Sequence, residues 1–192
     1  MKHCILRCWL FLLLCLMGCN EPTTALPSVI QTFDQAAPLD TARWQAYQDE
    51  KGRYRVAYPV QWTLLSSAVS TDITHFVNLA ENGTTRAGIT IIVQEPNANL
   101  SAVADKAQKT LQAQNGISEL EVISEIGVTV NGLRGLERIV QYKIAEQVLT
   151  NRMLYLRHSQ YLFALILTTE NHLLMDYTPR FEEVIRTFTV LK

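Results

Sequence analysis

Cysteine thiols are the most reactive side chains in this chain, and all of them lie near its beginning. They are Cys4, Cys8, Cys15 and Cys19. No cysteine follows, so the rest of the chain can form neither a Cys-type zinc cluster nor a disulfide and cannot supply a cysteine nucleophile. Cys19 closes an uncharged apolar stretch, and it is the residue to which we assign covalent chemistry.

The residues before Cys19 have the layout of a secretory leader. Lys2 and Arg7 supply positive charge at the start, and an uncharged apolar run follows them. A membrane-spanning helix needs about 20 apolar residues, and polar residues end this run too early. The sequence therefore predicts a signal peptide over residues 1–18 and not a transmembrane anchor.

The end of this run suggests how the leader is processed. It consists of Leu16, Met17, Gly18 and Cys19. This stretch resembles the lipobox that bacterial signal peptidase II recognises. The resemblance implies cleavage between Gly18 and Cys19 and a lipid on the Cys19 sulfur. Dual acylation anchors a protein stably, so we expect a lipid-anchored protein on the extracytoplasmic face of a membrane. The alternative is a leader that is cleaved without lipid, which releases a secreted protein.

Size and charge limit what the remaining chain can do. Removal of residues 1–18 leaves 174 of the 192 residues, enough for one domain with a hydrophobic core. Lys2 and Arg7 leave with the leader, so 15 basic residues face 18 acidic residues, a formal charge of −3. We expect no nucleic-acid partner, because the sequence contains no basic stripe. Binding to anionic lipid through a polybasic face is likewise not expected.

Other chemistry-bearing residues are sparse. Outside the leader the histidines are His75, His158 and His172, which are far apart in sequence. Glu170 and His172, with Asp176, come nearest to metal-ligand spacing, but a surface-loop histidine is the favoured interpretation. The sequence contains no HExxH motif, GxSxG elbow or glycine-rich phosphate loop. We therefore predict a protein that is not an enzyme and binds no cofactor or metal.

Periodicity predicts the elements that position these residues. Residues 19–41 contain several prolines among small polar residues and predict a flexible tether with a reach of roughly 25 Å, or alternatively an arm folded onto the domain. The domain itself is predicted to span 42–192. Its predicted strands are 53–58, 74–80, 87–94, 120–130, 133–144, 147–157 and 161–167. Short connections between them predict antiparallel neighbours.

Two helices complete the prediction. One spans 99–115 with Asn99 as its N-cap, and the last begins at Thr178-Pro179, where threonine caps and proline takes the first helical position. Strand 161–167 is apolar throughout, so both of its faces should be buried. Nearer the start of the domain, the aromatic residues Tyr54, Tyr58 and Trp62 either line a ligand groove or pack in the core, and core packing is favoured.

Two motifs carry a family resemblance that covers about 42–192. The opening motif is Gly52-x-Tyr54-x-Val56-x-Tyr58-Pro59-x-x-Trp62, and the closing motif is Tyr177-x-Pro179-x-Phe181-x-x-Val184-Ile185-x-x-Phe188. Both motifs, and the order of elements between them, resemble PsbP-like proteins. The resemblance implies an α+β fold, an α/β/α sandwich whose central antiparallel sheet has helices on both faces. This fold is shared with a Ran-binding nuclear import factor and with secretion-effector chaperones.

The resemblance also implies a function. Relatives of this fold bind other proteins and are not enzymes, and lipidated PsbP-like proteins are accessory subunits or assembly helpers of photosystem II. We therefore expect a non-enzymatic accessory protein that docks on a membrane protein complex, with photosystem II as the partner if the host is photosynthetic. The alternative is a lipid-anchored carrier of a small ligand or metal, with its pocket between sheet and helix.

Overall fold

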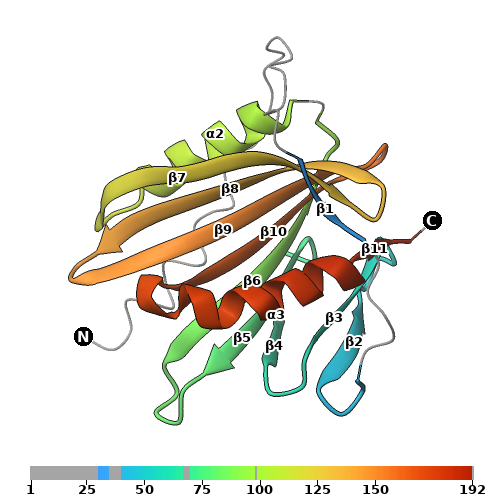
Figure 1. The fold of residues 1–192 in the computed structure, drawn as a ribbon, viewed down its shortest axis with the longest axis horizontal. Helices are drawn as coiled ribbons and strands as arrows, with labels where there is room; N and C mark the ends of the chain where they lie inside the picture. Colours follow the sequence, from blue (N-terminus) through green and yellow to red (C-terminus); the bar gives the residue numbers. More distant parts are fainter. Residues whose placement is uncertain (1–29, 35–39, 67–69, 98, 192) are drawn as a thin grey trace.

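The structure is a computed structural model, and it describes residues 30–34, 40–66, 70–97 and 99–191. A large sheet dominates it, and a small sheet and two α-helices pack beside the large one (Figure 1). In sheet order, the large sheet contains β1 (Ile30–Phe33), β7 (Ile117–Val130), β8 (Leu133–Ile144), β9 (Gln147–Arg157), β10 (Leu162–Glu170), β6 (Thr85–Gln94), β5 (Ile73–Leu79) and β4 (Thr63–Ser66). The small sheet contains β11 (Thr189–Val190), β3 (Tyr54–Pro59) and β2 (Trp44–Gln48).

The α+β class predicted from the sequence agrees with this architecture, but the large sheet is mixed. Its neighbours pair antiparallel except β1, which runs parallel to β7 with Ile30 opposite Gly127. The prediction of a wholly antiparallel sheet is therefore wrong at this edge. β1 and β7 are far apart in sequence, so no short connection forces them to run antiparallel. β1 also lies within the range 19–41, for which the sequence left open a flexible tether and an arm folded onto the domain. Over these four residues the chain pairs with β7, as such an arm would.

Two Asn-Gly turns fix the hairpins as predicted. Asn131 and Gly132 both have positive φ, 47° and 84°, which is the geometry of a type I′ turn between β7 and β8. Gly83 has a φ of 75° in the connection between β5 and β6. The next connection, Ala145-Glu146, is equally short and has Ala145 at a φ of 53°. Strands β8 and β9, between and after these turns, have the residue bounds that the sequence predicted.

The core consists of two clusters that share the central strands. Leu154 and Leu165 belong to one cluster, whereas Tyr155 and Ala164 belong to the other. Because side chains alternate across a strand, the clusters lie on opposite faces of the large sheet. Residues 162–167 of β10 are at most 5 % exposed, so the prediction that both faces of this strand are buried is confirmed.

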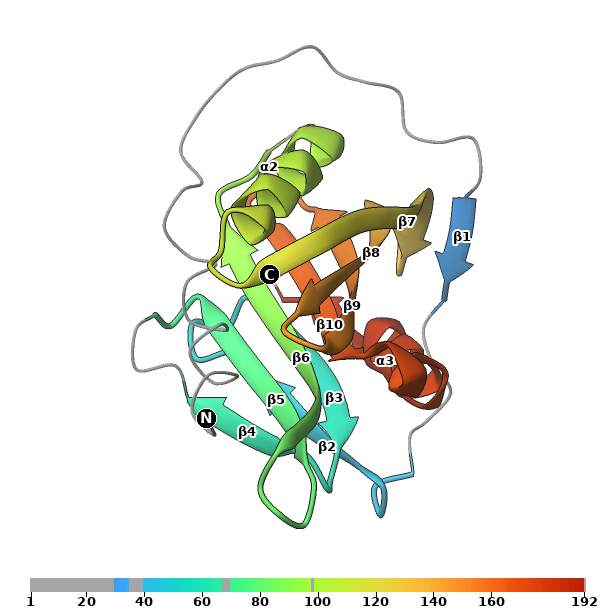
Figure 2. The same ribbon diagram turned by 90° about the vertical axis from the view of Figure 1, so that its left-hand side faces the viewer.

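Each α-helix contributes to a different cluster. α2 (Leu100–Gln112) packs with β8, β9 and β10, and α3 (Leu174–Thr187) packs with the alternate residues of the sheet and with β3 (Figures 1 and 2). The small sheet thus shares the face on which α3 lies. The sequence resemblance did not predict this second sheet, whose strands β3 and β11 come from opposite ends of the domain.

Of the two helix starts predicted from the sequence, one is confirmed and the other is wrong. The Asn99 side chain accepts a hydrogen bond from the Ala102 N–H at 3.0 Å, so the predicted N-cap of α2 is confirmed. α3 begins at Leu174, directly after the 3₁₀ turn η1 (Asn171–Leu173), so the predicted start at Thr178-Pro179 is wrong. Pro179 lies inside the helix. Leu173 and Leu174 pack against the core, and this burial extends the helix ahead of the proline.

Candidate functional site

The residues predicted for lipid attachment, Gly18 and Cys19, lie outside the described residues. The remaining candidates can be placed. They are the possible metal ligands around His172 and the aromatic residues of the opening motif. The structure adds two further features, a set of arginine–carboxylate clusters and the open edges of the large sheet.

The acidic and histidine side chains before α3 do not assemble a metal site. The His172 Nδ1 lies 3.3 Å from a Glu170 carboxylate oxygen, and the imidazole is 70 % exposed. The backbone carbonyl of Asp176 accepts a hydrogen bond from Arg180. Across the described residues, no group of three or more His, Cys, Asp or Glu side chains is placed to hold a metal ion. The favoured surface-loop interpretation of His172 fits these positions.

The aromatic residues of the opening motif are core residues and line no groove. Tyr54, Tyr58 and Trp62 are all at most 7 % exposed. Tyr54 stacks on Phe188, with ring centroids 5.5 Å apart, and its hydroxyl donates to Thr74 Oγ1 at 2.8 Å. Burial raises the pKa of the Tyr54 hydroxyl, and the hydrogen bond to Thr74 only partly offsets this rise. The motif therefore joins the small sheet to β5 and to the end of α3.

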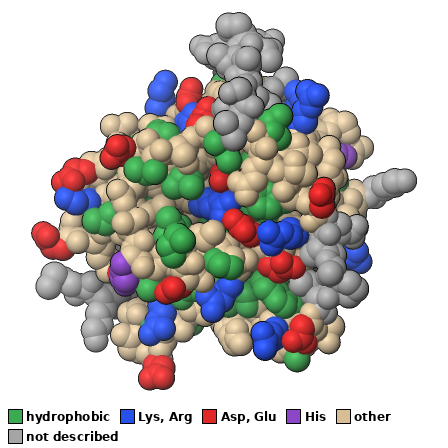
Figure 3. Space-filling view, viewed as in Figure 1, with side chains coloured by type: hydrophobic (Ala, Val, Ile, Leu, Met, Phe, Trp, Pro, Cys, Tyr) green, Lys and Arg blue, Asp and Glu red, His purple; other side chains and the backbone are tan. Residues whose placement is uncertain are grey.

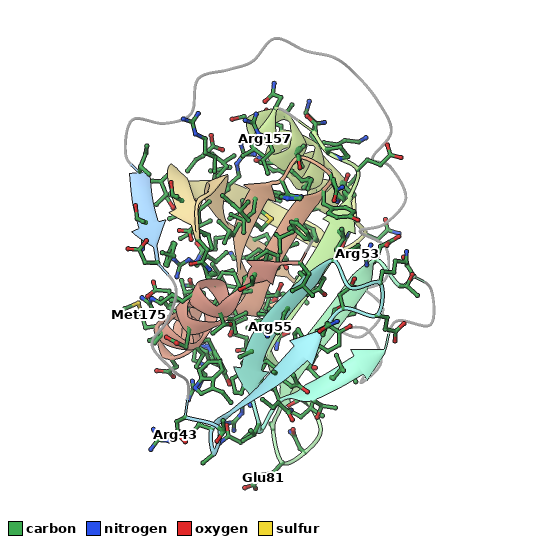
Figure 4. The ribbon with its side chains drawn as sticks, turned by 90° about the vertical axis from the view of Figure 1, so that its right-hand side faces the viewer. Arg43, Arg53, Arg55, Glu81, Arg157 and Met175 are labelled. Carbon is green, nitrogen blue, oxygen red and sulfur yellow. The ribbon has the colours of Figure 1, made fainter. Side chains whose placement is uncertain are left out.

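A buried ion cluster joins the turn before β3 to the start of β5. Arg53 is labelled in Figure 4. Its guanidinium donates to both carboxylate oxygens of Asp49, at 2.7 and 2.9 Å, and also contacts Asp72, to which Lys51 donates at 2.8 Å. Burial alone would raise the pKa of Asp49. The hydrogen bonds and charge of Arg53 outweigh that effect, so the pKa lies below its ordinary value. The sequence did not single out this cluster, because Asp72 is distant from Arg53 along the chain.

A second cluster lies between the sheet and α3. Arg152 donates to Glu137 at 2.8 Å and to Glu182 of α3 at 3.1 Å, and its guanidinium lies over the Phe181 ring. Burial raises the pKa of the Glu137 carboxyl, and the charge of Arg152 opposes that rise. Perturbed carboxyl groups are candidates for catalysis when they line a cleft. Glu137 is instead 3 % exposed, so the pair acts as a structural link between sheet and helix.

A third cluster fixes α2 to the sheet. Arg138 of β8 donates to Glu125 at 2.6 Å and to Asp105 of α2 at 2.7 Å. Burial would lower the pKa of Arg138, but these two carboxylates raise it above its ordinary value. The guanidinium therefore stays charged, and both helices are held to the large sheet by a buried arginine.

The two edges of the large sheet differ in how well they are protected. At the β7 edge, the part of β7 that β1 does not cover is irregular, because its pairing with β8 has two register shifts, between Ser118 and Glu121 and between Val122 and Ser124. Such bulges, together with the glutamates there, prevent another strand from pairing regularly. At the other edge, β4 carries Leu64 and Leu65 without a charged residue, and no described strand pairs with its outer side.

Exposed apolar side chains surround β4. Leu64 and Leu65 are each 37 % exposed, and Val60 and Leu79 nearby are 38 % and 46 % exposed. We call these four residues the β4 edge patch. Exposed apolar side chains next to the unpaired backbone groups of an edge strand are typical of a protein-docking site. Sequence periodicity missed this site because β4 is only four residues long and follows an irregular stretch.

The surface has no strong field of one sign on the side that carries α3. Figure 3 shows acidic and basic side chains interspersed there. Within the described ranges, no helix is long and apolar enough to cross a bilayer.

Comparison with known proteins identifies the fold. No protein-family model matches the chain, and a search of curated proteins found no match. Among solved structures, cyanobacterial PsbP (CyanoP) from Synechocystis sp. PCC 6803 matches with a TM-score of 0.62 at 18% identity, over 81% of this chain and 97% of that protein's chain. The PsbP-like fold is thus supported by the structure.

Two further solved structures extend the likeness. LpqN, described as involved in cell envelope biogenesis of Mycobacterium tuberculosis, matches with a TM-score of 0.58 at 12% identity, over 78% of this chain and 91% of that one. A mutant of Mog1 matches with a TM-score of 0.56 at 15% identity, over 78% of this chain and 96% of that one. At these identities the likeness concerns the fold alone.

Proposed function

We propose that this chain is a lipid-anchored, non-enzymatic accessory protein that docks on a membrane protein complex outside the cytoplasm. Three observations support the proposal. The lipobox-like residues end at Cys19, the fold is PsbP-like, and one structural neighbour is described as taking part in cell envelope biogenesis. In a photosynthetic host the complex is photosystem II. We further propose that the layers form an α/β/α sandwich, supported by the placement of α2 and α3 in opposite core clusters.

The β4 edge patch is the proposed docking site, and its unprotected apolar edge is the observation that carries the proposal. An extended segment of the partner can add to β4 through backbone hydrogen bonds, while Leu64 and Leu65 contact its side chains on the two faces. The short strand limits the contact area. Affinity at this edge is therefore modest, and a membrane anchor on both proteins compensates by raising their local concentration.

Sheet order separates this docking edge from the anchored end of the chain. β1 and β4 are the two outermost strands, with six strands between them. Adjacent strands lie about 4.8 Å apart, so the path across the curved sheet from one edge to the other is roughly 34 Å. The chain therefore enters the sheet at the edge opposite the proposed docking edge, and Figure 2 shows β1 and β4 at these two edges.

A pull-down from detergent-solubilised membranes tests the proposal. The native chain should recover a specific membrane protein, and Leu65→Lys should reduce that recovery at least several-fold, because lysine places a charge in the apolar contact. Met175→Lys is the matched control, since Met175 is 78 % exposed and lies outside the β4 edge patch. The proposal fails if neither the native chain nor a Cys19→Ala form kept in the same compartment recovers a partner.

A further inference from the structure

A second set of exposed apolar side chains lies at the opposite edge of the large sheet. Ile30 is 64 % exposed, Ile123 is 52 % exposed and Val122 is 39 % exposed. Ile30 begins β1, and the other two lie on the part of β7 that precedes its pairing with β1. We call these three residues the β7 edge patch.

The direction of β1 connects this patch with the proposed anchor. β1 runs parallel to β7, and Ile30 pairs with Gly127, so the chain enters β1 from the end of β7 that carries Val122 and Ile123. Eleven residue steps separate Cys19 from Ile30. A flexible segment of that length has a root-mean-square reach of roughly 18 Å, and fully extended it spans about 38 Å. Acyl chains on Cys19 therefore keep this edge of the sheet close to the bilayer.

The patch suits a lipid surface better than a partner strand. The pairing of β7 with β8 has register shifts on both sides of Val122, and a backbone bulged in this way does not offer a regular ladder to another strand on its outer side. Insertion into the interfacial region of a bilayer needs no backbone pairing; it requires exposed apolar side chains whose charged neighbours are largely compensated. Two nearby carboxylates are offset by bases, Glu119 by Lys143 at 2.6 Å and Glu125 by Arg138 at 2.6 Å.

We propose that the β7 edge patch rests on the surface of the bilayer, with Ile123 and Val122 in the interfacial region. The preferred surface has no net charge, because Glu121 is also exposed there and the processed chain carries a formal charge of −3. In this orientation the β1–β7 edge of the large sheet faces the bilayer, and the β4 edge patch, at the opposite edge, faces away from it. The proposal rests on the lipid anchor of the proposed function, and it adds a defined orientation.

The absence of cysteine after Cys19 makes the test direct. A lipid on Cys19 blocks its sulfur, so Ile123→Cys creates a single thiol for labelling with a bimane fluorophore. Leu64→Cys is the matched control at the opposite edge, where an apolar residue is also exposed. The acylated full chain is reconstituted into phosphatidylcholine vesicles, with and without lipids that carry a nitroxide in the acyl chain near the headgroup.

Nitroxide lipids should quench the label at position 123 about twofold or more, and the label at position 64 hardly at all, because only an interfacial side chain comes within contact range. Equal quenching at both positions, or quenching at position 64 alone, would overturn the proposed orientation. If the chain floats with the vesicles but position 123 is not quenched, the orientation fails while the anchor stands. If the purified chain lacks the diacylglycerol mass and stays in the aqueous fraction, the anchor itself fails, and the orientation with it.

Discussion

Replacement of Arg152 by methionine should leave the Glu137 carboxylate buried without its counter-ion. The two side chains are 5 % and 4 % exposed, and Arg152 Nε lies 2.8 Å from the carboxylate. Methionine can retain the contact with the Phe181 ring, over which the guanidinium lies at 5.7 Å. Removal of one partner of a buried ion pair costs about 3–5 kcal/mol. We expect Arg152→Met to lower the free energy of unfolding by this amount at pH 7.

The loss of stability caused by Arg152→Met should become smaller as the pH falls. Burial raises the folded-state pKa of Glu137 above its ordinary value of 4.5, and the charge of Arg152 limits the rise. A carboxyl with a raised folded-state pKa destabilises the fold above that pKa, and this destabilisation disappears as the pH falls to the unfolded value. Loss of Arg152 raises the folded-state pKa further. The difference in stability between the variant and the native chain should therefore shrink between pH 7 and pH 5.

Urea denaturation followed by tryptophan fluorescence at both pH values measures these differences. Arg55→Met is the matched control, because Arg55 is exposed on β3 (Figure 4) and its replacement should change stability by less than about 0.5 kcal/mol. Arg152→Met combined with Glu137→Leu should recover most of the loss, since it removes the unpaired charge. A cost below about 1 kcal/mol at pH 7, or the same cost at both pH values, would refute the assignment of a buried, coupled pair.

Three further predictions concern the backbone and the first ion cluster. Gly135→Ala should lower stability by about 1–3 kcal/mol, because its Cβ would lie 2.7 Å from the Tyr155 carbonyl oxygen, and an unchanged melting temperature would contradict that close approach. Asn131 donates to two carbonyls at the end of α3 at 3.1 and 2.8 Å. Asn131→Gly loses these hydrogen bonds and should lower the free energy of unfolding by about 1 kcal/mol. Asn131→Ala should lower it further, because the backbone φ of 47° at this position disfavours alanine; equal losses in the two variants would exclude a role for φ. Asp49 has a lowered pKa, so its stabilisation is present above the unfolded value of 3.8 and disappears as the pH falls through the folded-state pKa. Asp49→Asn should thus destabilise the fold at pH 7, measured by urea denaturation, and the difference should vanish in acid; a difference that persists there would argue against the Asp49–Arg53 assignment.

The sequence predicted the features that are set by local chemistry. The Asn131-Gly132 turn, the Asn99 cap and the bounds of β8 and β9 all depend on residues that are close in sequence. The core role of the opening aromatic residues was the favoured interpretation, and their burial confirms it. Lipid attachment at Cys19 remains a prediction.

The features that sequence reasoning missed depend on contacts between residues that are far apart in sequence. β1 is short and has no clear period, and burial of Phe33 beside β7 holds it in place. Pro179 is a strong local signal for a helix start, yet packing of Leu173 and Leu174 begins α3 earlier. The candidate docking edge could not be found from periodicity, because the exposure of β4 is decided by its place at the end of the sheet.

The intact mass of the mature chain, purified from its native membrane, tests the lipid anchor most directly. We predict an N-terminal Cys19 that carries a diacylglycerol, and a Cys19→Ala form that is not acylated and leaves the membrane fraction. A mature chain that begins at another residue, or one that begins at Cys19 without added lipid mass and is recovered in the aqueous fraction, would contradict the anchor, on which both the proposed docking and the proposed orientation depend.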